Sequence, residues 1–216
     1  MITTLNKNAI DYLNPDPEQI DMHDIITILH KNQRFMGHRS YCLTGLQHVC
    51  LVAAKLWIDH LEWKLTLSGL HHDDNEVYMC DLPRPLKALL PDYVALEHRF
   101  QTVFEKKWDI DFSDPRIKIA DMWSYVKEEE MAELFSIDEG QYVDNMIFKI
   151  SPLPWDHAYS YIHFACNNIK EGKNIQEFVE ALSALCPKIV EHFDHATKVR
   201  TFLDAHKIVS DSPISR

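Results

Sequence analysis

One stretch decides both the fold and the chemistry of this chain, and it reads LHHDDNEVYMCDLPRPLK over residues 70–87. An apolar helical run ends in His72 and Asp73, Glu76 follows one helical turn later, and Pro83 then breaks the segment. Imidazoles and carboxylates are common ligands of divalent metals in hydrolytic sites. The stretch therefore predicts the end of a core helix that contributes to a metal site.

The hydrophobic pattern on both sides of this stretch has the period of an α-helix. Between Thr44 and His60, for example, apolar residues recur at the three-, four- and seven-residue spacings of an amphipathic helix. We expect helices over 21–33, 44–60, 63–74, 91–108, 117–135, 155–170 and 175–206, with Pro187 interrupting the last. Strand-like alternation does not persist, and residues 1–20 form a polar, turn-rich arm. The prediction is an all-α, single-domain helical bundle over 1–216, with the motifs in about 21–135 and C-terminal helices over 155–208.

Composition narrows the class of protein. The 216 residues are 46% hydrophobic and carry a net charge of −11, which disfavours a protein that coats nucleic acid, because a polyanion needs a basic face. The five cysteines include no C-x-x-C pair and are expected to be reduced and mostly buried. Without a signal-peptide pattern or an apolar run of about 18 residues, we expect a cytoplasmic protein with no membrane span.

Two further potential ligands lie outside the opening stretch. His48 is in the middle of the preceding helix and Asp121 is within a later one, and helices packed in a bundle can direct such side chains at one point. A bound ion would lower the pKa of a water molecule and polarise a phosphoryl group. The alternative is that His72 and Asp73 only cap a helix end, and a second pair at His23 shows how little a His-Asp dipeptide proves by itself. However, clustered acids at a helix C-terminus oppose the helix dipole, and a cation would resolve this conflict.

Taken together, the motifs resemble the HD-superfamily phosphohydrolases of phages and prophages, which are related to bacterial 5′-deoxynucleotidases and phage dATP triphosphohydrolases. The matching blocks, in order, are RFMGH (34–38), QH (47–48), HDxxE (72–76), DLPxPLK (81–87), LLPDY (89–93) and KxAD (118–121). The resemblance implies an HD-type helical bundle, in which homodimers are common. It also implies a divalent metal ion (Mn, Co, Zn, Fe, Ni or Mg) held by His48, His72, Asp73 and Asp121.

The resemblance also implies roles for the residues around these ligands. Glu76 would act with Asp73 in catalysis, by orienting or deprotonating the attacking water or by protonating the leaving oxygen. Arg34 would grip the substrate phosphate through its bidentate fork, and Phe35 would contact the sugar or base. Asp81 would read the deoxyribose hydroxyl, while Lys87 and Lys118 would bind phosphate. Most of these residues also have a plainer interpretation. Glu76 could be a surface glutamate, Phe35 a core residue and Asp81 a cap of the turn at Pro83. Lys87 and Lys118 could simply be solvated surface lysines.

The chain departs from the family pattern at two positions. Gln47-His48-Val49 replaces the common Glu-His-Ser, and Phe35 stands where tryptophan is frequent, so sugar and base selectivity are not fixed by the motifs. Three further histidines, His38, His71 and His157, are expected to be structural.

The function predicted from the sequence is hydrolysis at the α-phosphate of a 5′-deoxyribonucleotide, which releases the deoxynucleoside. A monophosphate would give free phosphate and a triphosphate would give intact triphosphate. The alternatives are an HD hydrolase of a signalling nucleotide, a nucleotide-binding module without catalysis, and a helical protein whose histidines are structural.

Overall fold

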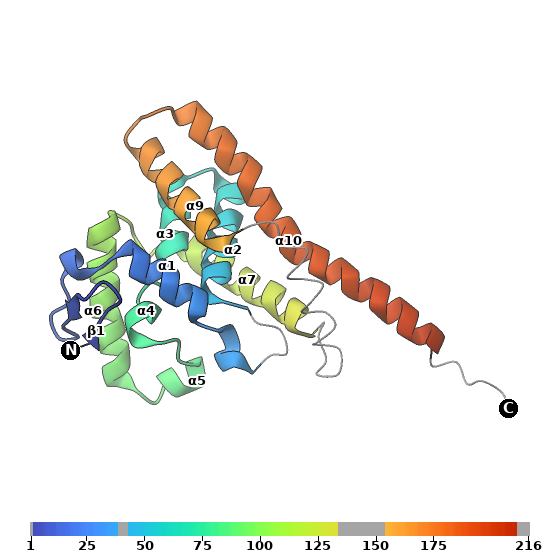
Figure 1. Ribbon diagram of the computed structural model, residues 1–216, viewed down its shortest axis with the longest axis horizontal. Helices are drawn as coiled ribbons and strands as arrows, with labels where there is room; N and C mark the ends of the chain where they lie inside the picture. The colour runs from blue at the N-terminus through green and yellow to red at the C-terminus, as the bar shows by residue number, and fades with distance from the viewer. Residues whose placement is uncertain (1, 39–42, 134–153, 211–216) are drawn as a thin grey trace.

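The computed structural model describes residues 2–38, 43–133 and 154–210, and it confirms the all-α fold. The helices, in chain order, are α1 (Met22–Lys31), α2 (Gly45–His60), α3 (Trp63–His71), α4 (Glu76–Met79), α5 (Arg84–Lys87), α6 (Pro91–Trp108), α7 (Pro115–Glu133), α9 (Trp155–Lys170) and α10 (Ile175–Ser210), with 3₁₀ turns η1 (Pro17–Gln19) and η2 (Arg34–Gly37) (Figure 1). The main hydrophobic core includes residues from Ile10 to Phe193, and a smaller cluster lies on α2, α3 and α7, formed by Val52, Leu56, Leu65, Ile117 and Ala120.

The N-terminal arm is more ordered than its turn-rich sequence predicts. It contains a two-residue antiparallel pair, β1 (Ile2–Thr3) and β2 (Ala9–Ile10), in which Ile2 is opposite Ile10. Ile10 is fully buried, and Lys107 of α6 donates to the Pro17 carbonyl at 2.8 Å. Burial of this one apolar residue and the contact with α6 explain why the arm folds onto the bundle.

Helix α2 lies at the centre of the bundle, where α1, α3, α7, α9 and α10 all contact it. Its start is fixed by a capping box, in which the Thr44 hydroxyl accepts from the Gln47 backbone N–H and the Gln47 side chain accepts from the Thr44 N–H. Its apolar residues from Leu46 to Trp57 are buried on several sides, as expected of a helix surrounded by others. A polar residue inside this helix, such as His48, is therefore held in a rigid position.

The helix expected over 63–74 ends earlier, at His71. The next residues form tight turns, in which the Asp74 N–H donates to the His71 carbonyl at 3.1 Å and the Glu76 N–H donates to the Asp73 carbonyl at 3.0 Å. The chain resumes as α4 at Glu76. The expected end at Asp74 is three residues too late, because the Asp74 side chain bonds to His71 and anchors a turn at this point.

Pro187 does not interrupt the last helix, contrary to expectation. Helix α10 continues through it from Ile175 to Ser210 and extends past the rest of the bundle at its C-terminal end (Figure 1). A proline costs a helix one backbone hydrogen bond and some strain. Burial of Leu182, Cys186 and Ile189 on both sides of Pro187 offsets that cost. The boundaries expected for α9, Trp155 and Lys170, are confirmed.

No helix in the described residues is long and apolar enough to cross a membrane.

Candidate metal centre

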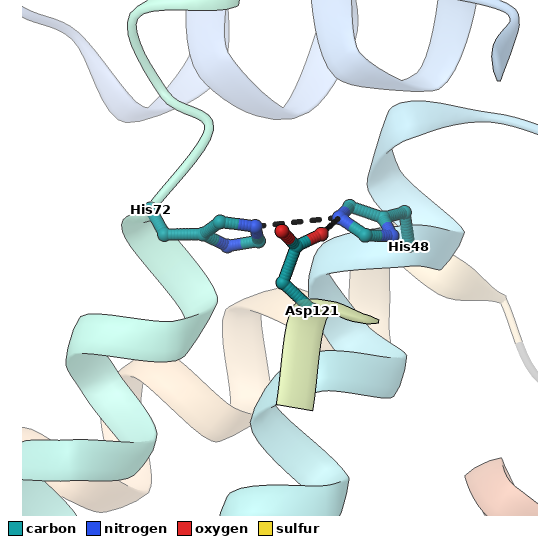
Figure 2. Close-up of side chains that lie close together, drawn as sticks. All are labelled: His48, His72 and Asp121. Carbon is teal, nitrogen blue, oxygen red and sulfur yellow. Dashed lines mark hydrogen bonds and ion pairs between the residues drawn. The ribbon is translucent and has the colours of Figure 1, made fainter. Parts of the chain in front are cut away.

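Three potential metal ligands from three helices converge at the centre of the bundle. His48 comes from the first turn of α2, His72 directly follows α3, and Asp121 comes from α7 (Figure 2). The His48 Nε2 atom lies 3.3 Å from His72 Nε2 and 3.5 Å from Asp121 Oδ1. Among the described residues, they form the only group of three or more potential ligands close enough to share an ion, with all donor atoms within 4.8 Å of one another.

The hydrogen bonds on the outer side of each imidazole show which nitrogen faces the site. The His72 Nδ1 atom lies 2.8 Å from the Gly69 carbonyl oxygen, which can only accept, so Nδ1 carries the proton. The His48 Nδ1 atom likewise faces the Glu128 carboxylate at 2.5 Å. In the neutral imidazoles, the lone pairs of both Nε2 atoms then point toward each other and toward Asp121. Such a concentration of electron pairs fits a bound cation, so this His-His-Asp group could hold a metal ion.

The electrostatics of these ligands agree with a site that accepts positive charge. Burial and Arg34 lower the pKa of His48, but Glu128 and Asp73 outweigh them and raise it to about 9. Burial raises the pKa of Asp121, yet the neighbouring His72 and His48 hold it below its usual range. Protons and metal ions would therefore compete for the same electron-rich point.

Asp73 lies against both imidazoles. Its Oδ2 atom is 3.3 Å from His48 Nε2 and its Oδ1 atom is 3.4 Å from His72 Nε2. Burial raises its pKa, but His72, His48 and Arg34 together hold it well below the usual range. An ionised Asp73 can therefore join the three converging ligands or receive a hydrogen bond from a water molecule beside them.

Beside the ligands lies a cavity of about 510 Å³, which is large enough for a nucleotide-sized molecule. The residues that line it are Arg34, Phe35, Met36, Asp73, Glu76, Asp81, Leu82, Pro83, Arg84, Pro85, Lys87, Lys118, Asp121, Met122 and Tyr125. Every substrate-binding and catalytic residue expected from the sequence is among them. The metal group is therefore accessible from a cleft that presents both charged and apolar walls.

Glu76 is buried at the wall of this cavity. Burial raises its pKa well above the usual range, and the charges of Asp73 and Asp81 raise it further, against the opposing effect of Arg34. If the helix continued past Asp73, the spacing of three residues would place Glu76 on the same face. The helix is broken between them, but the turn returns Glu76 to the cavity, where a protonated carboxyl could donate a proton.

Four cationic side chains border the cavity, and each is paired with an acid. Arg34 Nη1 lies 3.7 Å from Asp81 Oδ2, and Lys87 Nζ donates to Glu97 at 2.6 Å. Lys118 donates to Asp121, a candidate metal ligand. Arg84, which the sequence analysis did not single out, lies 3.6 Å from the same carboxylate and is 69% exposed. Lys118 and Arg84 thus stand at the mouth of the cavity, while Arg34 is inside it.

The apolar wall of the cavity includes Phe35 of η2 and Tyr125 of α7. Their rings are tilted with centroids 6.0 Å apart, and the Arg34 guanidinium lies 5.9 Å from the Phe35 centroid. Phe35 and Met36 both adopt positive φ angles, of 57° and 54°, and Gly37 continues the run at 72°. Two adjacent non-glycine residues in the left-handed region store strain, which places this turn among the features typical of functional sites.

Glu128 of α7 is a site residue that the sequence analysis missed. It is fully buried, and it contacts His48 and Arg34 together. Burial raises its pKa, but the charges of His48 and Arg34 outweigh this and lower it to about 2. In the sequence it lies in the run KEEE (127–130), which is typical of a solvated helix face. Its spacing of seven residues from Asp121, which places both on one face of the helix, is the signal that could have identified it.

The neighbours of the ligand pair belong to the core and not to the site. The His71 Nδ1 atom lies 2.6 Å from Asp74 Oδ2, and Asp74 also accepts from Trp108 and Tyr159. The expected cluster of acids at the helix end is thus divided, because Asp74 points away from the cavity. The structural role expected of His71 is confirmed, whereas the one expected of His157 is wrong, because His157 is an exposed residue of α9.

The comparisons with known proteins add a relative but no activity. No family model matches the chain. A curated protein of Escherichia coli (strain K12), the uncharacterized protein YfdR, is 29% identical over 179 residues, which cover 79% of this chain and 96% of that protein. The chain is thus similar to this protein along most of its length. Because the relative's name states no activity, the similarity does not indicate what the site does.

Proposed function

We propose that this chain is a divalent-metal-dependent phosphohydrolase that acts on the α-phosphate of 5′-deoxyribonucleotides and releases the deoxynucleoside. The observation that carries the proposal is the His48, His72 and Asp121 group, which opens into a cavity with Arg34 on its wall. A bound divalent ion would supply Lewis-acid activation of the phosphoryl group and of water. The resemblance of the sequence to HD-type phosphohydrolases supports the same chemistry.

The chain's own residues fit the remaining tasks of the reaction. Arg34 offers a guanidinium beside the ligands, and this group suits a phosphate oxygen pair. Asp73 can accept a hydrogen bond from the attacking water. Glu76, whose raised pKa favours its protonated form, can donate a proton to the departing 5′-oxygen. The Phe35 and Tyr125 rings provide an apolar wall for a sugar or base.

A second candidate is the release of intact triphosphate from a deoxynucleoside triphosphate. The observation that favours it is the pair Lys118 and Arg84, which stand at the mouth of the cavity on the outer side of Asp121. Cations at that position could bind phosphate groups beyond the α-phosphate. The two candidates share one cleavage step and differ only in the length of the phosphate chain.

Product analysis separates these possibilities. The full-length protein is incubated with Mn²⁺ or Co²⁺ and with dAMP, dATP, AMP or ATP in turn, and the products are resolved by chromatography. Deoxynucleoside and free phosphate from dAMP would support the first candidate, and triphosphate from dATP would support the second. If all four substrates remain intact with both metals, hydrolysis of adenine deoxynucleotides is excluded and a signalling nucleotide becomes the better substrate class.

A pair of aspartate variants tests the ligand assignment. Asp121→Ala should abolish metal-dependent turnover and leave the helical circular dichroism unchanged, because Asp121 is partly exposed at the cavity. Asp156→Ala, at an exposed position of α9, serves as the control and should retain full turnover. Equal turnover in the two variants would contradict the proposed ligand set.

A further inference from the structure

We propose that Glu128 is a positioning residue that ties the metal ligand His48 to the cavity arginine Arg34, so that one buried carboxylate sets the affinity of the site for both metal and phosphate. The inference deepens the proposed function and rests on it. It concerns a residue that the sequence motifs do not identify.

Each oxygen of Glu128 has a separate partner. Oε1 lies 2.5 Å from His48 Nδ1 and accepts from the Ser124 hydroxyl at 2.8 Å. Oε2 accepts from Arg34 Nε at 3.2 Å. The Glu128 side chain has no exposed surface, and it reaches these partners from α7, the helix that also carries Asp121. A buried carboxylate with this arrangement is a rigid bridge between α2 and the η2 turn.

The Oε1 side of the bridge controls His48. Because Oε1 faces Nδ1, it holds the ring proton on that nitrogen and leaves Nε2 directed toward His72 and Asp121. Carboxylates in this position orient metal-bound imidazoles and increase their basicity, and their loss commonly lowers metal affinity about 10- to 100-fold. Glu128 therefore acts on the metal through His48 without being a ligand itself.

The Oε2 side controls Arg34. Binding of Nε to Glu128 fixes the plane of the guanidinium, whose Nη1 atom lies 3.7 Å from Asp81 and 4.0 Å from Asp73 at the cavity wall. Without Glu128, the guanidinium would be free to close onto these two acids, which are both nearby and ionisable. Its terminal nitrogens would then be less available to a phosphate. The same carboxylate thus limits how closely the arginine approaches the two acids that it pairs with.

The test uses Glu128→Gln in the full-length protein, a change that keeps the shape of the side chain and removes its charge. Co²⁺ affinity is measured from the visible absorbance of the bound ion, and the affinity for inorganic phosphate is measured by calorimetry at saturating Co²⁺. We expect Co²⁺ affinity to fall about tenfold or more and phosphate affinity to fall severalfold. Glu130→Gln removes the same charge from the same helix, where Glu130 pairs only at the surface with Lys127, and should change each affinity less than twofold.

A double-variant cycle distinguishes positioning from a general structural effect. In an Arg34→Ala background, Glu128→Gln should still weaken Co²⁺ binding, but it should not weaken phosphate binding further, because its effect on phosphate acts through Arg34. An equal loss of phosphate affinity with and without Arg34 would overturn the proposal, as would unchanged affinities in Glu128→Gln.

Ser124→Ala provides a milder variant in case Glu128→Gln fails to fold. It removes one hydrogen bond to Oε1 and the 3.1 Å contact of the Ser124 hydroxyl with His48 Nδ1, but it keeps the carboxylate. Co²⁺ affinity should therefore fall a fewfold while phosphate affinity stays unchanged. A parallel loss of both affinities would contradict the division between the two oxygens. Since neither measurement needs turnover, binding that behaves as expected in a protein without nucleotidase activity would uphold the bridge and reject the proposed reaction.

Discussion

At the scale of single residues, the side chains of the site each serve two partners. His48 directs one nitrogen to Glu128 and the other to the ligand group, and Asp73 lies between the imidazoles and Arg34. Lone pairs, charges and protons are thus held in fixed positions by the fold. The hydrolysis that we propose would need such preorganisation.

Arg84 offers a test at this scale. Because its guanidinium is exposed at the mouth of the cavity, Arg84→Ala should weaken inorganic phosphate binding to the Co²⁺-loaded protein by about threefold to fivefold, the effect of a solvent-screened charge worth ~1 kcal/mol. The loss should shrink as salt is raised from 50 to 500 mM. Calorimetry at the two ionic strengths measures both effects.

The matched control for that variant is Arg116→Ala, which removes an arginine that pairs with Glu62 and Asp114 at the surface. Its phosphate affinity should equal that of the unaltered protein at both salt concentrations. An equal decrease in the two variants would mean that only the net charge of the protein matters, and that Arg84 has no place in the site.

The sequence predicted the ligands of this site better than it predicted their surroundings. His48, His72 and Asp121 were expected from residue type and order, and the structure brings them together. Glu128 and Arg84 were missed for different reasons. Glu128 lies in a charged run that usually marks a solvated helix face, and Arg84 occupies the unspecified position of the DLPxPLK motif. Which charged residue is buried depends on how helices pack, and this information is not local to the sequence.

At the scale of elements, the contact between α2 and α3 sets the distance between His48 and His72. Gly69 of α3 permits this close approach, because a Cβ atom added there would lie 2.3 Å from the Leu56 Cδ1 atom of α2. Leu56 is buried, so its side chain has little room to move away. Close packing of these two helices therefore depends on a residue without a side chain.

Gly69→Ala should consequently destabilise the protein, by about 1–2 kcal/mol, since overpacking outweighs the gain in helix propensity. In a Leu56→Ala background the clash is absent, and the same change should become neutral or stabilising. Urea unfolding followed by circular dichroism measures all four proteins. A loss of the same size in both backgrounds would show that Leu56 does not limit the space at Gly69.

The ends of a helix could be predicted where local sequence signals determine them. The predictions were wrong where packing against other helices determines where a helix ends. The capping box at Thr44 and the proline before Trp155 mark the starts of α2 and α9. The end of α3 was missed because it depends on a bond between His71 and Asp74, and α10 continues through Pro187 because buried neighbours hold it. Neither the bond nor the burial can be predicted from the pattern of apolar residues.

At the scale of the whole molecule, a buried polar network joins α3, α6 and α9 behind the metal group. His71 stacks on Trp108 of α6 with ring centroids 4.8 Å apart, and its Nε2 atom lies 2.9 Å from His163 Nδ1 of α9. Tyr159 donates to Asp74 from the same helix, α9. The network links three helices through hydrogen bonds that would be costly to leave unmade.

This network should make global stability sensitive to acid. Burial lowers the pKa of His163 to about 3, and the neighbouring His71 contributes to the decrease. In the unfolded chain a histidine has a pKa of about 6.5, so between about pH 6.5 and 3 the unfolded chain binds a proton at this residue and the folded protein does not. The free energy of unfolding therefore decreases as the pH falls through this range. At pH 5 the loss from this residue should reach at most about 2 kcal/mol.

His163→Gln isolates that contribution. Although the variant should be less stable at pH 7.5, its free energy of unfolding should fall less between pH 7.5 and 5 than that of the unaltered protein. Urea titrations at the two pH values measure the difference. Parallel pH dependence in the two proteins would assign the acid sensitivity to other groups.

The turn at residues 71–74 has a consequence for how this segment can change. Its outer residues, His71 and Asp74, face the interior, while His72 and Asp73 between them face the cleft. Deleting or inserting one residue here would shift the two carboxylates by one position and exchange a residue of the core for a residue of the candidate site. A substitution changes one side chain, whereas a change in length redirects several side chains at once. The length of the chain in this segment is therefore as important to the site as its composition.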